Sequence, residues 1–139
     1  MALSEKGTMY DPRNIFYMNK LATGPDAAGV IDIEAPIEEN IKRVAKKKAK
    51  SVGDVTVVVL DRPRHDEIKS RIRQIGARIK LISDGDVAGA LLTCKEEGGA
   101  DLLVGIGGSP EAVITACAIK CLGGNMQCKL WARDEKEAV

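Results

Sequence analysis

Three short polar clusters carry the residues that could do chemistry, and each one directly follows a run of apolar residues. They are Asp61-Arg62-Pro63-Arg64-His65, Asp84-Gly85-Asp86 and Gly107-Gly108-Ser109-Pro110-Glu111. Arginines bind phosphate oxygens through a two-pronged fork, carboxylates bind sugar hydroxyls or divalent cations, and glycine-rich turns let a ligand approach the backbone. The three clusters together predict a binding site for a polar, anionic ligand.

The first cluster places two arginines on either side of a proline that stiffens the turn. Arg62 and Arg64 stand where a predicted strand gives way to a helix, so a phosphate there would meet guanidinium donors and helix amides together. The alternative is that both side chains are solvated surface. His65 is the only histidine of the chain, and in a first helical turn we expect it to be structural or exposed rather than catalytic.

The second cluster offers two carboxylates on either side of a glycine. Asp84 and Asp86 could ligate a divalent cation, or they could accept hydrogen bonds from sugar hydroxyls. Asp86 could instead cap the helix that follows, because Asp is a preferred capping residue. The capping role and the binding role are compatible with each other.

The third cluster resembles a dinucleotide-binding turn but departs from its fingerprint, because a proline stands where the last glycine belongs. We expect Ser109 to cap the following helix and Pro110 to occupy its first position. Glu111 then lies in the first helical turn, where the helix dipole favours an ionised carboxylate. It could be a metal ligand, or it could merely complement the dipole.

Around these clusters, a strand–helix unit occurs three times. The nearly continuous apolar run at residues 56–60 predicts a strand covered on both faces. Residues 79–83 and 102–106 predict two further strands, and a helical pattern follows each of the three. This alternation predicts a three-layer α/β/α domain with a mainly parallel sheet and right-handed crossovers. In such a sheet the three clusters would share the edge at the carboxyl ends of the strands, where ligands bind.

This domain is expected to span residues 35–139, after an irregular lead-in over residues 1–34. Its first helix begins near Pro36 and ends in Lys46, Lys47, Lys48 and Lys50, which we interpret as a solvated helix end rather than a phosphate patch. Residues 15–18 predict a short strand or a helical turn. Leu130 and Trp131 predict the start of one more strand, and residues 134–139 a frayed helix or a truncation.

The composition excludes several classes of protein. A chain of 139 residues with 45% hydrophobic and 29% charged residues fits one soluble globular domain. A net charge of +1 and an aromatic content of 3% give no reason to propose nucleic acid or membrane as a partner. Cys117 and Cys121 share one helix face and could bind zinc or form a redox pair, although buried reduced thiols are the preferred interpretation. These features favour a cytoplasmic protein.

The three clusters, in this order and spacing, closely resemble the class II fructose-1,6-bisphosphatases. The segments 4–7, 17–21 and 121–124 extend the resemblance over almost the whole chain. It implies the lithium-sensitive phosphatase fold and a hydrolase of gluconeogenesis that uses Mn²⁺ or Mg²⁺ to remove the 1-phosphate of fructose 1,6-bisphosphate. It also implies a set of substrate-binding residues and one ligand of a catalytic metal: Tyr17, Arg62, Arg64, Asp84, Asp86 and Gly108 for the substrate, and Glu111 for the metal.

One part of the family pattern has no counterpart in this sequence. The resemblance implies that the family's amino-terminal half supplies most metal ligands, through acidic residues and an Asp-Pro-Ile-Asp-Gly-Thr-like motif, whereas here Asp11-Pro12 continues into Arg13-Asn14. One glutamate cannot fix the ions of two-metal phosphoryl chemistry. We therefore expect a carboxyl-terminal portion that is inactive alone, whose partners are the missing half and further copies in a homo-oligomer.

Two alternatives stay open at this point. The first is a non-catalytic module that binds sugar phosphates for regulation, which would need all of its ligand contacts within this chain. The second is a nucleotide-binding α/β domain, against which the failed fingerprint argues.

Overall fold

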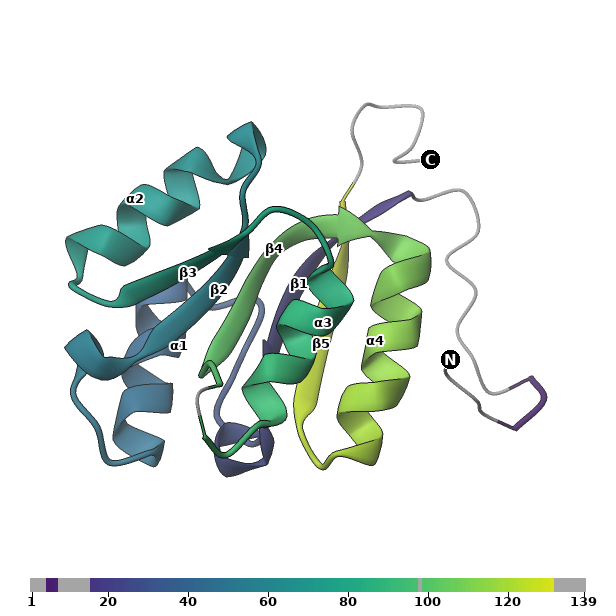
Figure 1. Ribbon diagram of the computed structural model, residues 1–139, viewed down its shortest axis with the longest axis horizontal. Helices are drawn as coiled ribbons and strands as arrows, with labels where there is room; N and C mark the ends of the chain where they lie inside the picture. The colour runs from purple at the N-terminus through teal and green to yellow at the C-terminus, as the bar shows by residue number, and fades with distance from the viewer. Residues whose placement is uncertain (1–4, 8–15, 98, 132–139) are drawn as a thin grey trace.

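The computed structural model describes residues 5–7, 16–97 and 99–131, and its centre is one five-stranded sheet (Figure 1). The strands are β1 (Tyr17–Thr23), β2 (Thr56–Leu60), β3 (Arg78–Ile82), β4 (Leu102–Gly108) and β5 (Asn125–Trp131). The helices are α1 (Ile37–Lys47), α2 (Asp66–Gln74), α3 (Asp86–Leu91) and α4 (Ser109–Cys121). The segments predicted at 134–139 and around Asp11-Pro12 lie outside the described residues.

The sheet has the strand order β3-β2-β4-β1-β5 and is mixed. Strand β2 runs parallel to both β3 and β4, whereas β1 runs antiparallel to β4 and β5. The α/β class is therefore confirmed, but only two of the four strand pairings are parallel. The antiparallel strand comes from the segment that we expected to be an irregular lead-in, so residues 17–23 belong to the middle of the sheet.

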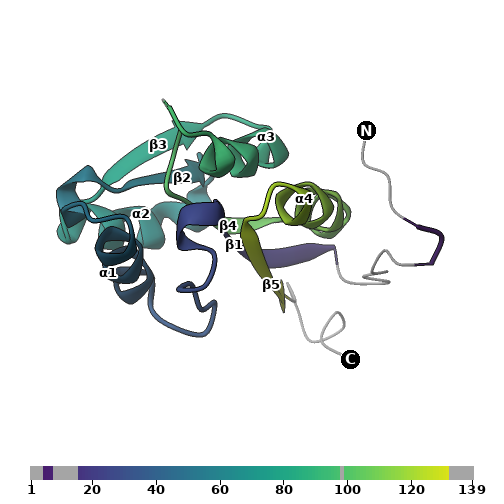
Figure 2. The same ribbon diagram turned by 90° about the horizontal axis from the view of Figure 1, so that it is seen from below.

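The helices cover both faces of the sheet, with α1 and α2 on one face and α3 and α4 on the other (Figures 1 and 2). Two apolar cores lie between the layers, and β2 contributes to both. Val57 and Val59 belong to the core under α1 and α2, and Val58 belongs to the core under α3 and α4. This alternation explains why the sequence of β2 is continuously apolar.

Most element boundaries lie close to their predicted positions, and two predictions need correction. Residues 17–23 form a strand, so the helical turn considered for residues 15–18 is wrong. Leu130 and Trp131 end β5 instead of beginning a strand. The turn between β5 and α4 explains this difference, because Gly123 takes a left-handed φ of 81° and lets the chain reverse immediately.

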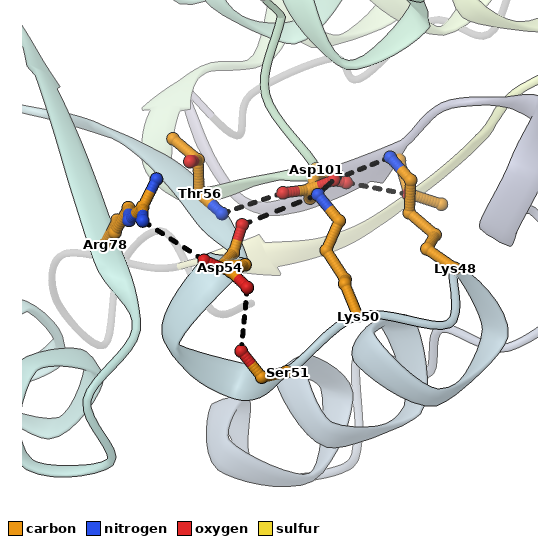
Figure 3. Close-up of polar contacts among 8 residues, drawn as sticks. Lys48, Lys50, Ser51, Asp54, Thr56, Arg78 and Asp101 are labelled. Carbon is orange, nitrogen blue, oxygen red and sulfur yellow. Dashed lines mark hydrogen bonds and ion pairs between the residues drawn. The ribbon is translucent and has the colours of Figure 1, made fainter.

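The lysine-rich end of α1 also differs from expectation. Lys46 and Lys47 are exposed, but Lys48 and Lys50 both pair with the buried carboxylate of Asp101, at 2.6 and 2.8 Å from Oδ1 (Figure 3). The other carboxylate oxygen of Asp101 accepts the backbone N–H of Thr56 at 2.8 Å. This network joins α1 to the beginnings of β2 and β4, at the edge of the sheet opposite the three polar clusters.

Among the described residues, no helix is long and apolar enough to cross a membrane.

The four cysteines are all free thiols. Cys94 and Cys117 are half-buried, whereas Cys121 and Cys128 are exposed. The interpretation of Cys117 and Cys121 as buried thiols is therefore wrong for Cys121. It is the last residue of α4.

Candidate functional site

The sheet brings all three polar clusters to one edge. They follow β2, β3 and β4, which run in the same direction, so their carboxyl ends lie together. Strand β1 runs the opposite way, and its first residue, Tyr17, pairs with Gly108 at the end of β4. Tyr17 therefore joins the same edge from the far end of the sequence.

Arg64 links the first cluster to the third. Its Nε and Nη2 donate to the carbonyl oxygen of Ile106 at 3.1 and 2.9 Å, and its Cζ lies 5.6 Å from the centre of the Tyr17 ring. The Tyr17 ring in turn packs edge-on against Trp131, with centroids 6.1 Å apart. A cation over an aromatic face is held by the ring quadrupole. Three elements thus fix an arginine whose side chain is still exposed.

Arg62 links the first cluster to the second. Its Nη1 donates to the carbonyl oxygens of Asp61 and Ser83 at 2.9 and 2.7 Å, so the guanidinium bridges the ends of β2 and β3. The residue is half-buried. Both arginines are therefore oriented by backbone carbonyls while they keep solvent-facing surface, which is the arrangement that an anion-binding arginine needs.

His65 is 2% exposed and makes two hydrogen bonds. Its Nδ1 lies 2.6 Å from the carbonyl oxygen of Leu60, and its Nε2 accepts the N–H of Ile106 at 2.8 Å. Burial is the largest cause that lowers the pKa of His65, and the charges of Arg64 and Lys69 act in the same direction, against the hydrogen bond to Leu60. This histidine was expected to be structural or exposed; its burial and its two hydrogen bonds agree with the first alternative and not with the second.

Asp86 does not cap its helix. The residue before it, Gly85, occupies the capping position with a left-handed φ of 77°, and no side chain caps α3. The Asp86 carboxylate instead pairs with Lys20 of β1 at 2.5 Å, where the lysine is only 3% exposed. A side chain at Gly107 would collide with this carboxylate and would lie 2.9 Å from the Lys20 nitrogen. Asp84, in contrast, is exposed.

The third cluster is built differently from the prediction. Gly108 occupies the capping position of α4, and Ser109 is already the first helical residue. The Ser109 hydroxyl is buried and has no hydrogen-bond partner among the described residues, so the prediction that it caps the helix is wrong. Glu111 is exposed in the first turn, and its carboxylate lies directly over the Cα of Gly108, where a side chain would collide with it.

The acidic residues that the structure describes do not form a metal site by themselves. Among the described residues, no group of three or more His, Cys, Asp or Glu side chains is arranged to hold a metal ion. Glu111 could supply one carboxylate to an ion held mainly by other groups. A magnesium or manganese ion needs several oxygen ligands, so we derive no metal-dependent step from this chain alone.

A cavity of about 340 Å³ adjoins the site on the α1 and α2 side, and its wall includes Arg64, His65 and Ile106. Its other cations are already paired. Arg71 binds the Glu38 carboxylate through two hydrogen bonds of 2.8 and 2.7 Å. The cavity shares only Arg64 with the residues predicted to bind substrate, so it does not gather those residues together.

Sequence reasoning missed two residues at this edge. Lys20 was visible as a lone cation within the apolar stretch of β1, which signals a buried partner. Trp131 was assigned only to the start of a strand, and its contact with Tyr17 depends on antiparallel pairing between β1 and β5. A predicted pairing of these two strands would have revealed it.

The chain is an α/β domain, and the arginines and the glycine-rich strand end at this edge of its sheet are groups that would suit an anionic ligand. All 139 residues match the protein family described as bacterial fructose-1,6-bisphosphatase, glpX-encoded. The chain therefore belongs to the family of class II fructose-1,6-bisphosphatases.

Two relatives illustrate the match. The fructose-1,6-bisphosphatase class 2 of Haemophilus influenzae is 49% identical over 119 residues, which cover 86% of this chain and 36% of that protein. The fructose-1,6-bisphosphatase 1 class 2 of Escherichia coli K12 is 40% identical over 135 residues, which cover 97% of this chain and 40% of that protein. The chain thus spans less than half the length of these relatives.

Proposed function

We propose that this chain binds the substrate in a class II fructose-1,6-bisphosphatase, which hydrolyses fructose 1,6-bisphosphate to fructose 6-phosphate and phosphate in gluconeogenesis. The observation that carries the proposal is the position of Arg64, which is held between Ile106 of β4 and the Tyr17 ring at the shared edge of the sheet. Family membership supports the choice of ligand.

In this proposal, the two arginines anchor the phosphate that is not removed. Arg62 and Arg64 are already oriented by backbone carbonyls, so binding loses little of their side-chain freedom. Asp84 and Asp86 accept hydrogen bonds from sugar hydroxyls. Tyr17 and Gly108 complete the wall, where the glycine lets the ligand approach the backbone. Binding energy at the distant phosphate then orients the reacting one.

Glu111 contributes a single ligand to a Mn²⁺ or Mg²⁺ cluster that is held mainly outside this chain. Bound metal would activate water and stabilise the charge of the transferred phosphoryl group. The reaction itself therefore needs the rest of the enzyme, and the 139-residue chain binds substrate without hydrolysing it.

The test measures binding and turnover on the same purified chain. We expect titration with fructose 1,6-bisphosphate to shift NMR signals of residues at the β2, β3 and β4 ends, and no phosphate release in the presence of Mn²⁺. Metal-dependent release that scales with chain concentration would contradict the assignment of the metal site elsewhere. Shifts confined to other surfaces would contradict the binding site.

A complete class II enzyme carrying the same residues separates this proposal from a purely regulatory sugar-phosphate module. If the site serves catalysis, a substitution of Arg64 lowers kcat/KM for fructose 1,6-bisphosphate. If it serves regulation, the substitution leaves kcat/KM unchanged and removes only the response to added sugar phosphate.

A further inference from the structure

The two hydrogen bonds of His65 define its protonation state. The carbonyl oxygen of Leu60 can only accept a hydrogen bond, and it lies 2.6 Å from Nδ1. The N–H of Ile106 can only donate, and it lies 2.8 Å from Nε2. Both bonds form together only when the proton sits on Nδ1 and Nε2 carries a lone pair. The ring is therefore the neutral Nδ1–H tautomer.

Arg64 and His65, which are consecutive in sequence, hold both polar groups of one residue in β4. His65 accepts the N–H of Ile106, and Arg64 donates twice to its carbonyl oxygen. Beside this contact, Gly105 has a φ of 152°, and a side chain there would lie 2.9 Å from Nε2 of His65. The imidazole thus packs directly on the backbone of β4, where only glycine leaves it room.

We propose that His65 is a positioning residue of the anion-binding site. Its neutral ring binds the backbone of Ile106 and so holds the glycine-rich end of β4 in place. In that position the Ile106 carbonyl oxygen accepts the hydrogen bonds that orient the Arg64 guanidinium. Arg64 and Gly108 then meet the ligand phosphate in one fixed arrangement. The identity of that ligand rests on the proposed function, whereas the hydrogen bonds and the protonation state do not.

Protonation of His65 at acidic pH should break its hydrogen bond to Ile106 and so disturb the position of Arg64. Protonation would place an N–H on Nε2 against the N–H of Ile106, so two donors would face each other. The charged groups around the ring are Arg64 beside it in sequence and Lys69 of α2, and both disfavour the imidazolium form. Arginine side chains stay charged in proteins, so any loss of binding would come from the changed position of Arg64.

The first experiment uses the fact that the chain has a single histidine. Two-bond ¹H–¹⁵N correlation spectra of the untagged, labelled chain contain one set of imidazole signals. We expect a protonated Nδ1 and an unprotonated Nε2 at neutral pH, which persist below the ordinary histidine pKa of 6.5. An Nε2–H tautomer, or a ring that titrates as a free histidine does, would overturn the proposal.

The second experiment separates the two ring nitrogens by substitution. His65→Gln can place an acceptor near the position of Nε2, whereas His65→Asn can place a donor near Nδ1 and offers nothing to Ile106. We expect His65→Asn to weaken fructose 1,6-bisphosphate binding about tenfold, and His65→Gln to retain most of the affinity. Equal losses in the two variants would refute a positioning role for the Nε2 acceptor.

A matched control removes a buried hydrogen bond at the other edge of the sheet. Thr23→Val deletes the hydrogen bond of 2.8 Å from the Thr23 hydroxyl to the carbonyl oxygen of Asp101. It leaves the hydrogen bonds of His65 and Arg64 to Ile106 intact. We expect this variant to lose stability without losing affinity. A loss of affinity like that of His65→Asn would assign both effects to general destabilisation and would overturn the proposal.

A ligand-free measurement keeps the proposal testable if the parent chain does not bind fructose 1,6-bisphosphate. The Arg64 Nε–H donates to Ile106, so its exchange with solvent should be slow in the parent and in His65→Gln, and fast in His65→Asn. Absent binding with this exchange pattern would refute the proposed ligand alone. Exchange that is equally slow in all variants would refute the positioning role.

Discussion

The ion pair between Lys20 and Asp86 leads to the sharpest prediction about stability. Lys20 is 3% exposed and Asp86 is 18% exposed, and the nitrogen and oxygen lie 2.5 Å apart. Substituting Lys20 by Met keeps the length and apolar stem of the side chain but leaves the carboxylate without its cation. The folded state then contains a largely buried and uncompensated charge.

The size of the effect follows from this burial. Breaking a buried ion pair by removing one partner typically costs about 3–5 kcal/mol of unfolding free energy. Because Asp86 retains some contact with water, we expect Lys20→Met to lie at the lower end, at about 3 kcal/mol. For a domain of this size, that loss corresponds to a decrease in Tm of roughly 10 °C.

A matched control lies on the neighbouring strand. Lys129 of β5 pairs with Glu34 at 3.0 Å, but both side chains are more than half exposed. Exposed pairs contribute about 0–1 kcal/mol, so Lys129→Met should change the unfolding free energy by less than 1 kcal/mol. The comparison isolates burial, because the substitution and the type of partner are the same in both variants.

Urea unfolding followed by circular dichroism measures all the variants. The double substitution Lys20→Met with Asp86→Leu removes both charges, and we expect it to recover most of the loss, since apolar replacement of a buried pair is often neutral. If Lys20→Met costs no more than Lys129→Met, the reasoning is refuted and the pair contributes only as a surface contact.

Three further predictions concern the site and the opposite edge of the sheet. Arg62→Lys and Arg64→Lys keep the charge but lose the fork, so each should weaken substrate affinity by about ten- to a hundredfold in titrations; unchanged affinity would exclude a phosphate anchor. In a complete enzyme, Glu111→Gln should reduce kcat severely at unchanged Tm, whereas a role limited to the helix dipole would cost only about 0.3–1 kcal/mol of stability. Burial raises the pKa of Asp101, but the hydrogen bonds from Lys48, Lys50 and Thr56 outweigh it and hold the pKa below its ordinary value of 3.8. The stabilisation is therefore complete above that ordinary value and is lost as the pH falls through the lower, folded-state pKa. Asp101→Asn should reduce the unfolding free energy at pH 7 and should weaken its decrease at acidic pH. If the unfolding free energy of the variant decreases with acid as steeply as that of the parent, Asp101 does not cause the decrease.

Much of the fold was predictable because its signals are local. The apolar run of β2 has the predicted bounds, and its three central residues, Val57 to Val59, are buried alternately on one side of the sheet and on the other. The position of β1 was not predictable in this way. Its seven residues contain nothing local that selects β4 and β5 as partners, and antiparallel pairing with strands far along the chain is decided by tertiary packing.

The candidate site was likewise predictable only in part. The convergence of the three clusters followed from strand direction alone, and the structure confirms their shared edge. The partners of individual side chains did not follow. Asp86 pairs with a lysine 66 residues away, and Gly85 rather than Asp86 occupies the capping position of α3. Ser109 fails as a cap because the helix starts one residue earlier than its spacing suggested.

The antiparallel insertion of β1 has a consequence for the order of folding. Strands β2, β3 and the helix between them form a contiguous stretch, so their contacts close short loops. Strand β1 must wait for β4 and β5, since Tyr17 pairs with Gly108 and with Trp131. Such distant pairings slow folding, because a long loop must close before any contact stabilises it. During synthesis, the edge of the sheet that holds the three polar clusters can therefore be completed only after β5 has left the ribosome, although the arginine cluster has emerged much earlier.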